Sequence, residues 1–288
     1  IFYITHDSGI ALRIRNQFAI LIDSNTFNVS NNNSTSGIYF SNYSDPGPAG
    51  ATPEDNCFVN ITNNTFSGAY FPVLINDLGT AYSSFYMYNN QFQNTGLFGI
   101  SGMKITGTIK NNRFVNSTEN YCIYLSLSNP DIYGNYFNSD KRNMVLTASY
   151  PVIAPIRNNN NQLIWKGGRN GFNVNQGNDT IAKENIYLKS SLPITDLGEN
   201  SFSVPNSSSY HIFGSISSND SSQTYLTKRN CWIGNNDIPK IFMYNPLDTP
   251  VIQIGYIFTP VICIPSENTS NEITEIGFGM YDTTFISE

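Results

Sequence analysis

Apolar and polar residues recur along this chain in a doublet, Asn-x-Phe. The doublet occurs at Asn25–Phe27, Asn64–Phe66, Asn90–Phe92, Asn112–Phe114, Asn135–Phe137 and Asn200–Phe202. After the first interval, successive asparagines are 26, 22 and 23 residues apart. A period in this range is typical of solenoid proteins, in which each repeat buries its apolar face only against its neighbours.

Aligning the repeats on the asparagine gives two further fixed positions. Three residues earlier stands a large apolar side chain, at Ile22, Ile61, Met87, Ile109, Ile132 and, with Asn159 heading the next unit, Ile156. Directly before the asparagine stands a residue type that accepts a tight bend, at Ser24, Asn63, Asn89, Asn111, Gly134 and Asn158. Each unit is therefore predicted to contain a strand, a sharp bend and a second strand.

A further strand follows in each unit, with two apolar residues in alternation. These pairs are Ile38/Phe40, Val73/Ile75, Phe98/Ile100, Ile123/Leu125 and Met144/Leu146. No stretch keeps the spacing of an amphipathic helix. The pattern predicts an all-β fold with three short strands per coil, in which each strand pairs with its copy about 4.8 Å along the axis. The repeated asparagine either forms a ladder of stacked amides or serves only as a turn former.

Composition narrows the possible partners. The 288 residues carry a net charge of −6 and contain no basic run, so a nucleic-acid partner is not expected. No stretch of about 18 apolar residues occurs, so no membrane-spanning segment is predicted. Because the chain opens at Ile1 within an apparent strand, we interpret it as a processed or partial product, incomplete at the N-terminal end of the fold.

The four cysteines lack the spacing of a zinc site. With two histidines in the chain, no metal site is predicted. Cys231 and Cys263 either form a disulfide or remain buried thiols, and a Cys57–Cys122 pairing is also open.

A resemblance adds to this picture. The unit resembles the repeats of right-handed parallel β-helix proteins, the superfamily that includes pectate lyases. The C-terminal stretch is similar to the closing segment of many bacterial secreted or cell-surface members, through Asn230, Cys231, Trp232, Gly234, Asp237, Pro239, Ile241, Asp248, Tyr256 and Pro260. Two departures are Ile233, where those members have a second tryptophan, and the longer distance from Tyr256 to Pro260. The resemblance implies the fold and does not select among lyases, hydrolases, adhesins and structural proteins.

We therefore predict a right-handed parallel β-helix of about nine to ten coils over residues 1–262. A Pro/Gly-rich side loop is expected at about 42–57, because the first interval is longer than the others. Residues 230–262 are expected to form the last coil and a lid over the open end. Residues 263–288 are an extension or the start of a further module.

Strand alternation places a set of mixed side chains on one outer face. It comprises Tyr86, Tyr88, Lys110, Asp131, Tyr133 and Arg157. Tyrosine rings stack on sugars, and charged groups bond hydroxyls or carboxylates, so this face is a candidate polysaccharide-binding surface. Alternatively, tyrosine is simply favoured on an exposed sheet, with Lys–Asp pairs that aid solubility.

Three of these residues could instead belong to a catalytic site. A polysaccharide lyase needs a base near acidic groups, often with calcium. Lys110 and Arg157 are expected roughly 10 Å apart, with Asp131 between their columns. No cofactor other than possible calcium is implied, and no cluster of acids stands out.

Three functions remain. The first is a secreted or cell-surface β-helix with a structural or adhesive role, which contacts copies of itself or other surface proteins. The second is a carbohydrate-active enzyme, most simply a lyase. The third is a non-catalytic glycan-binding module.

Overall fold

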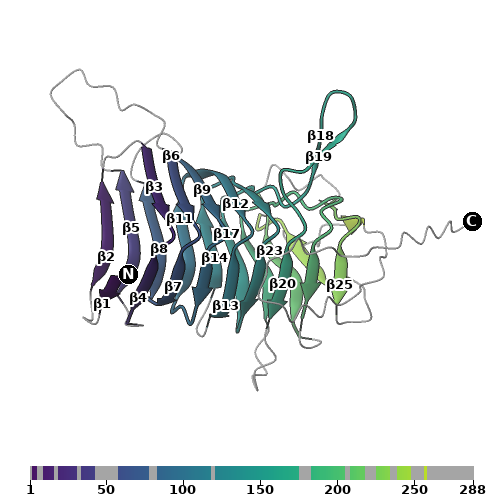
Figure 1. The fold of residues 1–288 in the computed structure, drawn as a ribbon. Coiled ribbons are helices and arrows are strands. Elements are labelled where there is room, and N and C mark those ends of the chain that lie inside the picture. Colours follow the sequence, from purple (N-terminus) through teal and green to yellow (C-terminus); the bar gives the residue numbers. More distant parts are fainter. Residues whose placement is uncertain are drawn as a thin grey trace, which may run out of the picture.

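The structure of the chain is a computed structural model. The structure describes residues 2–4, 9–15, 19–30, 34–42, 58–77, 83–117, 121–174, 183–204, 208–217, 225–233, 239–247 and 256–257. These residues form strands, turns and bends and contain no helix. Accordingly, no helix of this part is long and apolar enough to cross a membrane. The strands are stacked side by side into a solenoid (Figure 1).

Three parallel sheets run along the solenoid. Sheet A contains β1 (Phe2–Ile4), β4 (Thr26–Val29), β7 (Thr65–Gly68), β10 (Gln91–Gln93), β13 (Arg113–Ser117), β16 (Tyr136–Ser139), β20 (Gly171–Val174), β22 (Ser201–Ser203) and β25 (Cys231–Ile233). Sheet B contains β2 (Ile10–Arg15), β5 (Ser36–Asn42), β8 (Phe71–Asp77), β11 (Phe98–Met103), β14 (Tyr121–Ser126), β17 (Arg142–Thr147), β21 (Glu184–Lys189), β23 (Tyr210–Ser215) and β26 (Ile241–Tyr244). Sheet C contains β3 (Ala19–Asp23), β6 (Phe58–Thr62), β9 (Ser83–Tyr88), β12 (Ile105–Lys110) and β15 (Asp131–Tyr133).

Two short pairs complete the described strands. β18 (Ile156–Arg157) and β19 (Leu163–Ile164) form an antiparallel hairpin, whereas β24 (Tyr225–Leu226) and β27 (Tyr256–Ile257) are parallel.

The phenylalanine column predicted from the doublets is confirmed. Consecutive rings stack with centroids 4.5–5.1 Å apart from Phe27 to Phe202, and Trp232 closes the column 4.6 Å beyond Phe202. On sheet C the pairing places Ile22, Ile61, Met87, Ile109 and Ile132 in register, all of them buried. Equivalent side chains of successive coils thus lie over one another and form one core.

The buried asparagines form a ladder of stacked amides, the first of the two alternatives that the repeat left open. From Asn64 onward, each side-chain Nδ2 donates to the Oδ1 of the next coil, at 2.9–3.1 Å, as far as Asn230. The same Oδ1 also accepts the backbone N–H of the preceding asparagine, as from Asn90 to Asn112 at 2.9 Å. From Asn64 to Asn200, each ladder asparagine therefore has both its backbone N–H and its side-chain amide hydrogen-bonded to the next coil.

Two details of the predicted register are wrong. The unit after Asn135 is headed by Asn170, which is followed by Phe172, and not by Asn159. Residues 154–167 are an insertion in that coil, so Ile156 lies in the hairpin and Ile153 occupies the core. The inward pair of β11 is Ile100/Gly102, because Ile100 aligns with Val73. Phe98 instead faces outward, where its ring stacks on those of Phe71 and Tyr121.

Several predicted features lie wholly or largely outside the described residues. They are the Pro/Gly-rich side loop, most of the closing segment, and the extension from Cys263 onward. Cys122 is a free, buried thiol, so it does not pair with Cys57. Cys231 is disulfide-bonded, and its partner is not among the described residues.

The ladder predicts a large local stability effect. Replacing Asn112 by alanine removes the acceptor of the buried backbone N–H of Asn90 and one hydrogen bond from each neighbouring side-chain amide, those of Asn90 and Asn135. We expect unfolding to become easier by about 3 kcal/mol, measured by urea denaturation. The matched variant Asn60→Ala, on the outer face of sheet C, should change stability by less than about 0.5 kcal/mol. Equal effects of the two variants would contradict a structural role for the ladder.

Candidate functional site

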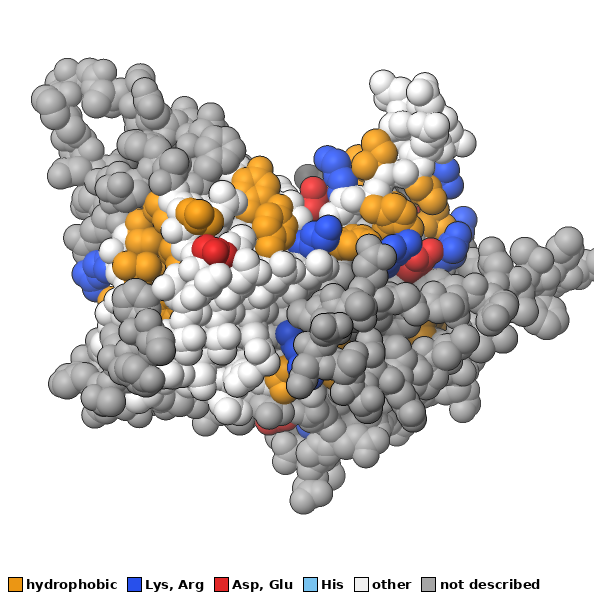
Figure 2. All heavy atoms as spheres, viewed as in Figure 1, with side chains coloured by type: hydrophobic (Ala, Val, Ile, Leu, Met, Phe, Trp, Pro, Cys, Tyr) orange, Lys and Arg blue, Asp and Glu red, His pale blue; other side chains and the backbone are white. Residues whose placement is uncertain are grey.

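The outer face of sheet C carries most of the predicted binding residues. The pairing places Tyr88, Lys110 and Tyr133 side by side in one column. A second column contains Tyr86 and Asp131, separated by Thr108. These side chains are partly exposed, and the Lys110 Nζ lies 5.1 Å from the centre of the Tyr133 ring. We call this set the sheet C surface; it runs along the top of the molecule in Figure 2.

Arg157 does not belong to this surface. It lies on β18 in the hairpin, and its Nη1 donates to the carbonyl of Asn161 at 2.9 Å across the hairpin turn. The prediction placed Arg157 on the sheet because the repeats were aligned with Asn159, instead of Asn170, as the ladder residue of that coil. The structure therefore brings five of the six predicted residues onto one face and leaves out Arg157.

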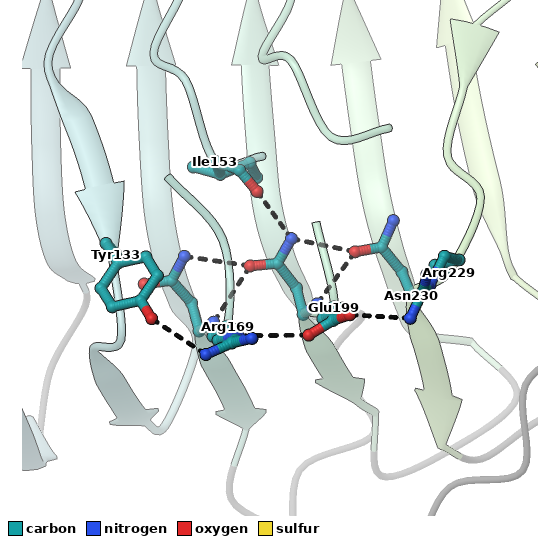
Figure 3. A network of polar contacts seen from close by, with 8 residues as sticks. Tyr133, Ile153, Arg169, Glu199, Arg229 and Asn230 are labelled. Carbon is teal, nitrogen blue, oxygen red and sulfur yellow. Dashed lines mark hydrogen bonds and ion pairs between the residues drawn. The ribbon is translucent and has the colours of Figure 1, made fainter. Parts of the chain in front are cut away.

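The end of the hairpin returns to the sheet C surface and meets a polar network. Arg169 donates from Nη1 to the Tyr133 hydroxyl at 3.2 Å and from Nε to Glu199 at 3.1 Å (Figure 3). Arg229 binds the other oxygen of Glu199 at 2.9 Å. The guanidinium of Arg169 also lies 4.4 Å from the centre of the Trp165 ring. Residues from the hairpin and from four successive coils thus form one cluster, which sequence spacing did not indicate.

Two carboxylates on sheet C have opposite electrostatic surroundings. Burial raises the pKa of Asp131, and the charge of Lys166 only partly opposes this shift. The pKa of Asp23, at the other end of the sheet, is lowered by hydrogen bonds from Thr62, Asn63 and Ser24. Asp131 is thus the carboxylate whose charged form the structure disfavours.

A second surface was missed in the sequence. Sheet B presents ten partly exposed aromatic side chains on its outer face: Tyr39, Phe71, Phe98, Tyr121, Tyr124, Tyr187, Tyr210, Phe213, Phe242 and Tyr244. We call this set the sheet B surface. For Tyr39, Tyr124, Tyr187, Phe213 and Phe242, the available signal was an aromatic residue between the two inward-facing positions of a strand, as Tyr39 lies between Ile38 and Phe40.

The aromatic rings of the sheet B surface form two series along the solenoid axis. Phe71, Phe98 and Tyr121 stack with centroids 5.8 and 5.3 Å apart. Further along, Tyr187, Phe213 and Phe242 stack at 6.0 and 5.6 Å. This arrangement gives an extended apolar surface with a repeat set by the coils.

Arg142 lies between the two aromatic series. Its guanidinium lies 4.1 Å from the centre of the Tyr187 ring and 5.7 Å from that of Tyr121, and its Nε contacts Glu184 at 2.6 Å. Cations also lie over the rings of Tyr39 and Tyr210. An ion pair and ring contacts thus hold Arg142 between the two aromatic series.

The raised pKa of Asp131 gives a pH prediction. A folded-state pKa above the unfolded value of about 3.9 means that the folded state binds more protons, so this group destabilises the fold as pH rises through that range. We expect Asp131→Asn to be more stable than the parent at pH 7. The difference should shrink as pH falls through the raised folded-state pKa and should be lost below about 4, in urea denaturation series at several pH values. A variant that is less stable at pH 7 would show that the charged form is favoured instead.

Within the described residues, no group of three or more His, Cys, Asp or Glu side chains is placed to hold a metal ion. Comparisons with known proteins give no relatives: no protein-family model, no curated protein and no solved structure matches the chain.

Proposed function

We propose that this protein is a secreted or cell-surface β-solenoid with an adhesive role, which binds an extended polysaccharide without turnover. The observation that carries the proposal is the sheet B surface, with its ten partly exposed aromatic side chains on a nine-stranded sheet. Soluble proteins rarely expose so extended an apolar array unless it contacts a partner.

A sugar polymer fits this surface better than a compact ligand does. Flat aromatic faces stack on sugar rings, and the coil spacing of about 4.8 Å repeats the contact along the axis. Arg142 and Lys189, which lies 5.8 Å from the centre of the Tyr187 ring, add donors for hydroxyl or carboxylate groups. Partners in this proposal are polysaccharides and, for a rod-like assembly, copies of the chain or other surface proteins.

We further infer a right-handed coil of about nine to ten turns, similar to the parallel β-helix superfamily that includes pectate lyases. Parallel crossover connections within one sheet are right-handed in about 98% of cases, which supports the handedness. The disulfide at Cys231 supports an oxidising location such as the cell exterior.

The alternative of a polysaccharide lyase loses part of its residue set. Lys110 and Asp131 share the sheet C surface, but Arg157 lies in the hairpin with its Nη1 bonded to Asn161. A lyase centred on Lys110 and Asp131 alone remains a second hypothesis. Burial raises the pKa of Asp131, and a raised pKa makes a carboxylate a stronger base for abstracting a proton.

The glycan proposal is tested with paired variants. We expect Tyr187→Ala/Phe213→Ala to weaken binding to a responsive polysaccharide at least about tenfold, because two stacking platforms are lost. The matched pair Tyr86→Ala/Tyr88→Ala, on sheet C, should retain binding. Affinity electrophoresis against a panel of neutral and acidic polysaccharides measures both variants, with denaturation curves to confirm folding.

Two results would contradict the proposal. One is the absence of binding to every polysaccharide in the panel by the folded parent protein. The other is formation of unsaturated products or new reducing ends that Lys110→Ala abolishes, which would make the protein an enzyme.

A further inference from the structure

The foot of the hairpin, where it meets sheet C, is a second candidate binding site and lies apart from the sheet B surface. It is formed by Lys110, Asp131, Tyr133, Trp165, Lys166 and Arg169. The hairpin stands above one end of the sheet C surface, so the foot is walled on one side (Figures 1 and 2). Trp165 contacts Tyr133 edge-on, with ring centres 6.4 Å apart.

The local charge at the foot is opposite in sign to that of the whole protein. The chain carries a net charge of −6. Among the described residues of the foot and the adjoining arginine network, the cations Lys110, Lys166, Arg169 and Arg229 interact with two acids, Asp131 and Glu199. Glu199 is shared by the two arginines, and burial disfavours the charged form of Asp131. A positive site therefore exists within an acidic protein.

Donors at the foot remain available for a ligand. Within the described part of the chain, Lys110 contacts the Tyr133 ring, and Lys166 interacts with Asp131 only through space, so neither ammonium group donates a hydrogen bond. Arg169 uses Nε and Nη1 for Glu199 and Tyr133, which leaves Nη2 without a described acceptor. Tyr133, in turn, keeps its hydroxyl proton, because it accepts from Arg169.

The hydrogen bonds that Arg169 already makes set its orientation before any ligand arrives. Glu199 and Tyr133 hold two of its donors, and the Trp165 ring packs against its guanidinium at 4.4 Å. A cation fixed in this way needs little ordering when it binds, which favours specific recognition over a diffuse surface attraction.

We propose that the hairpin foot binds an oxyanion, either the carboxylate or sulfate group of an acidic sugar or a free inorganic anion. Lys110, Lys166 and the Nη2 of Arg169 would donate to its oxygens, and Trp165 would lie beside it. The site does not depend on the aromatic series of sheet B, so it can be present whether or not that surface binds a glycan.

The test uses the fluorescence of Trp165. The chain has two tryptophans, and Trp232 is buried in the core column, where its Nε1 has no hydrogen-bond partner among the described residues. Trp232→Phe restores the residue type found in the rest of that column, so the fold should persist and Trp165 becomes the sole reporter. This protein is titrated with glucuronate, sulfate and glucose at constant ionic strength, because added salt alone screens charge.

We expect a saturable fluorescence change with glucuronate, sulfate or both, and none with glucose. Lys110→Gln/Lys166→Gln should weaken that binding by about tenfold or more, whereas Lys189→Gln on sheet B should not. A response to glucuronate alone identifies an acidic sugar as the ligand, and a response to sulfate alone identifies a tetrahedral anion. The proposal is overturned if neither anion gives saturation, or if the lysine double variant binds as the parent does.

Discussion

The buried ladder of asparagine amides is the constraint on which this structure depends. Each amide bonds both the neighbouring amide and a backbone N–H, and each also donates to a carbonyl of the preceding coil, as Asn112 does to Met87 at 2.8 Å. A coil shifted by one residue would leave these buried groups unpaired, at a cost of about 1–3 kcal/mol for each group. The ladder therefore fixes the register of sheets A and C, and the phenylalanine column follows from it.

A fixed register allows insertions of very different length. The hairpin leaves the coil after Ile153 and returns at Gly168, where the chain pairs again with Tyr133. Because the ladder resumes at Asn170, the fourteen residues from 154 to 167 change the outer surface without disturbing the core. A solenoid can thus change its outer surface by adding a loop, and the proposed anion site lies at the foot of such an insertion.

The three sheets share one interior and differ in their exteriors. The outer face of sheet A is mostly polar, with side chains such as Thr65, Ser67, Gln91 and Gln93. Sheet B is aromatic, and sheet C mixes tyrosines with charges of both signs. The same few residue types fill the core in every coil, so folding does not require these differences between the outer faces. They are the reason for assigning binding roles to sheets B and C.

Much of the interior could be predicted from the sequence, and much of the surface could not. The Asn-x-Phe doublets and the apolar residue three positions earlier are local patterns, so they determined the ladder, the two core columns and five residues of sheet C. The error at Asn159 arose in a run of four asparagines, Asn158 to Asn161, where local spacing gives no way to choose among candidates. Only burial of Asn170 between Asn135 and Asn200 identifies the ladder residue.

The tertiary structure alone decided which distant residues become neighbours. Arg169, Glu199 and Arg229 are each about thirty residues apart in the chain, yet they form one network because each lies directly before the ladder asparagine of its own coil. The aromatic side chains of sheet B likewise form continuous series only once the coils are aligned. Alternation within a strand is a local property that a sequence displays directly. Contact between coils depends on the number of residues in every intervening loop, and that number varies freely because loops carry no register of their own.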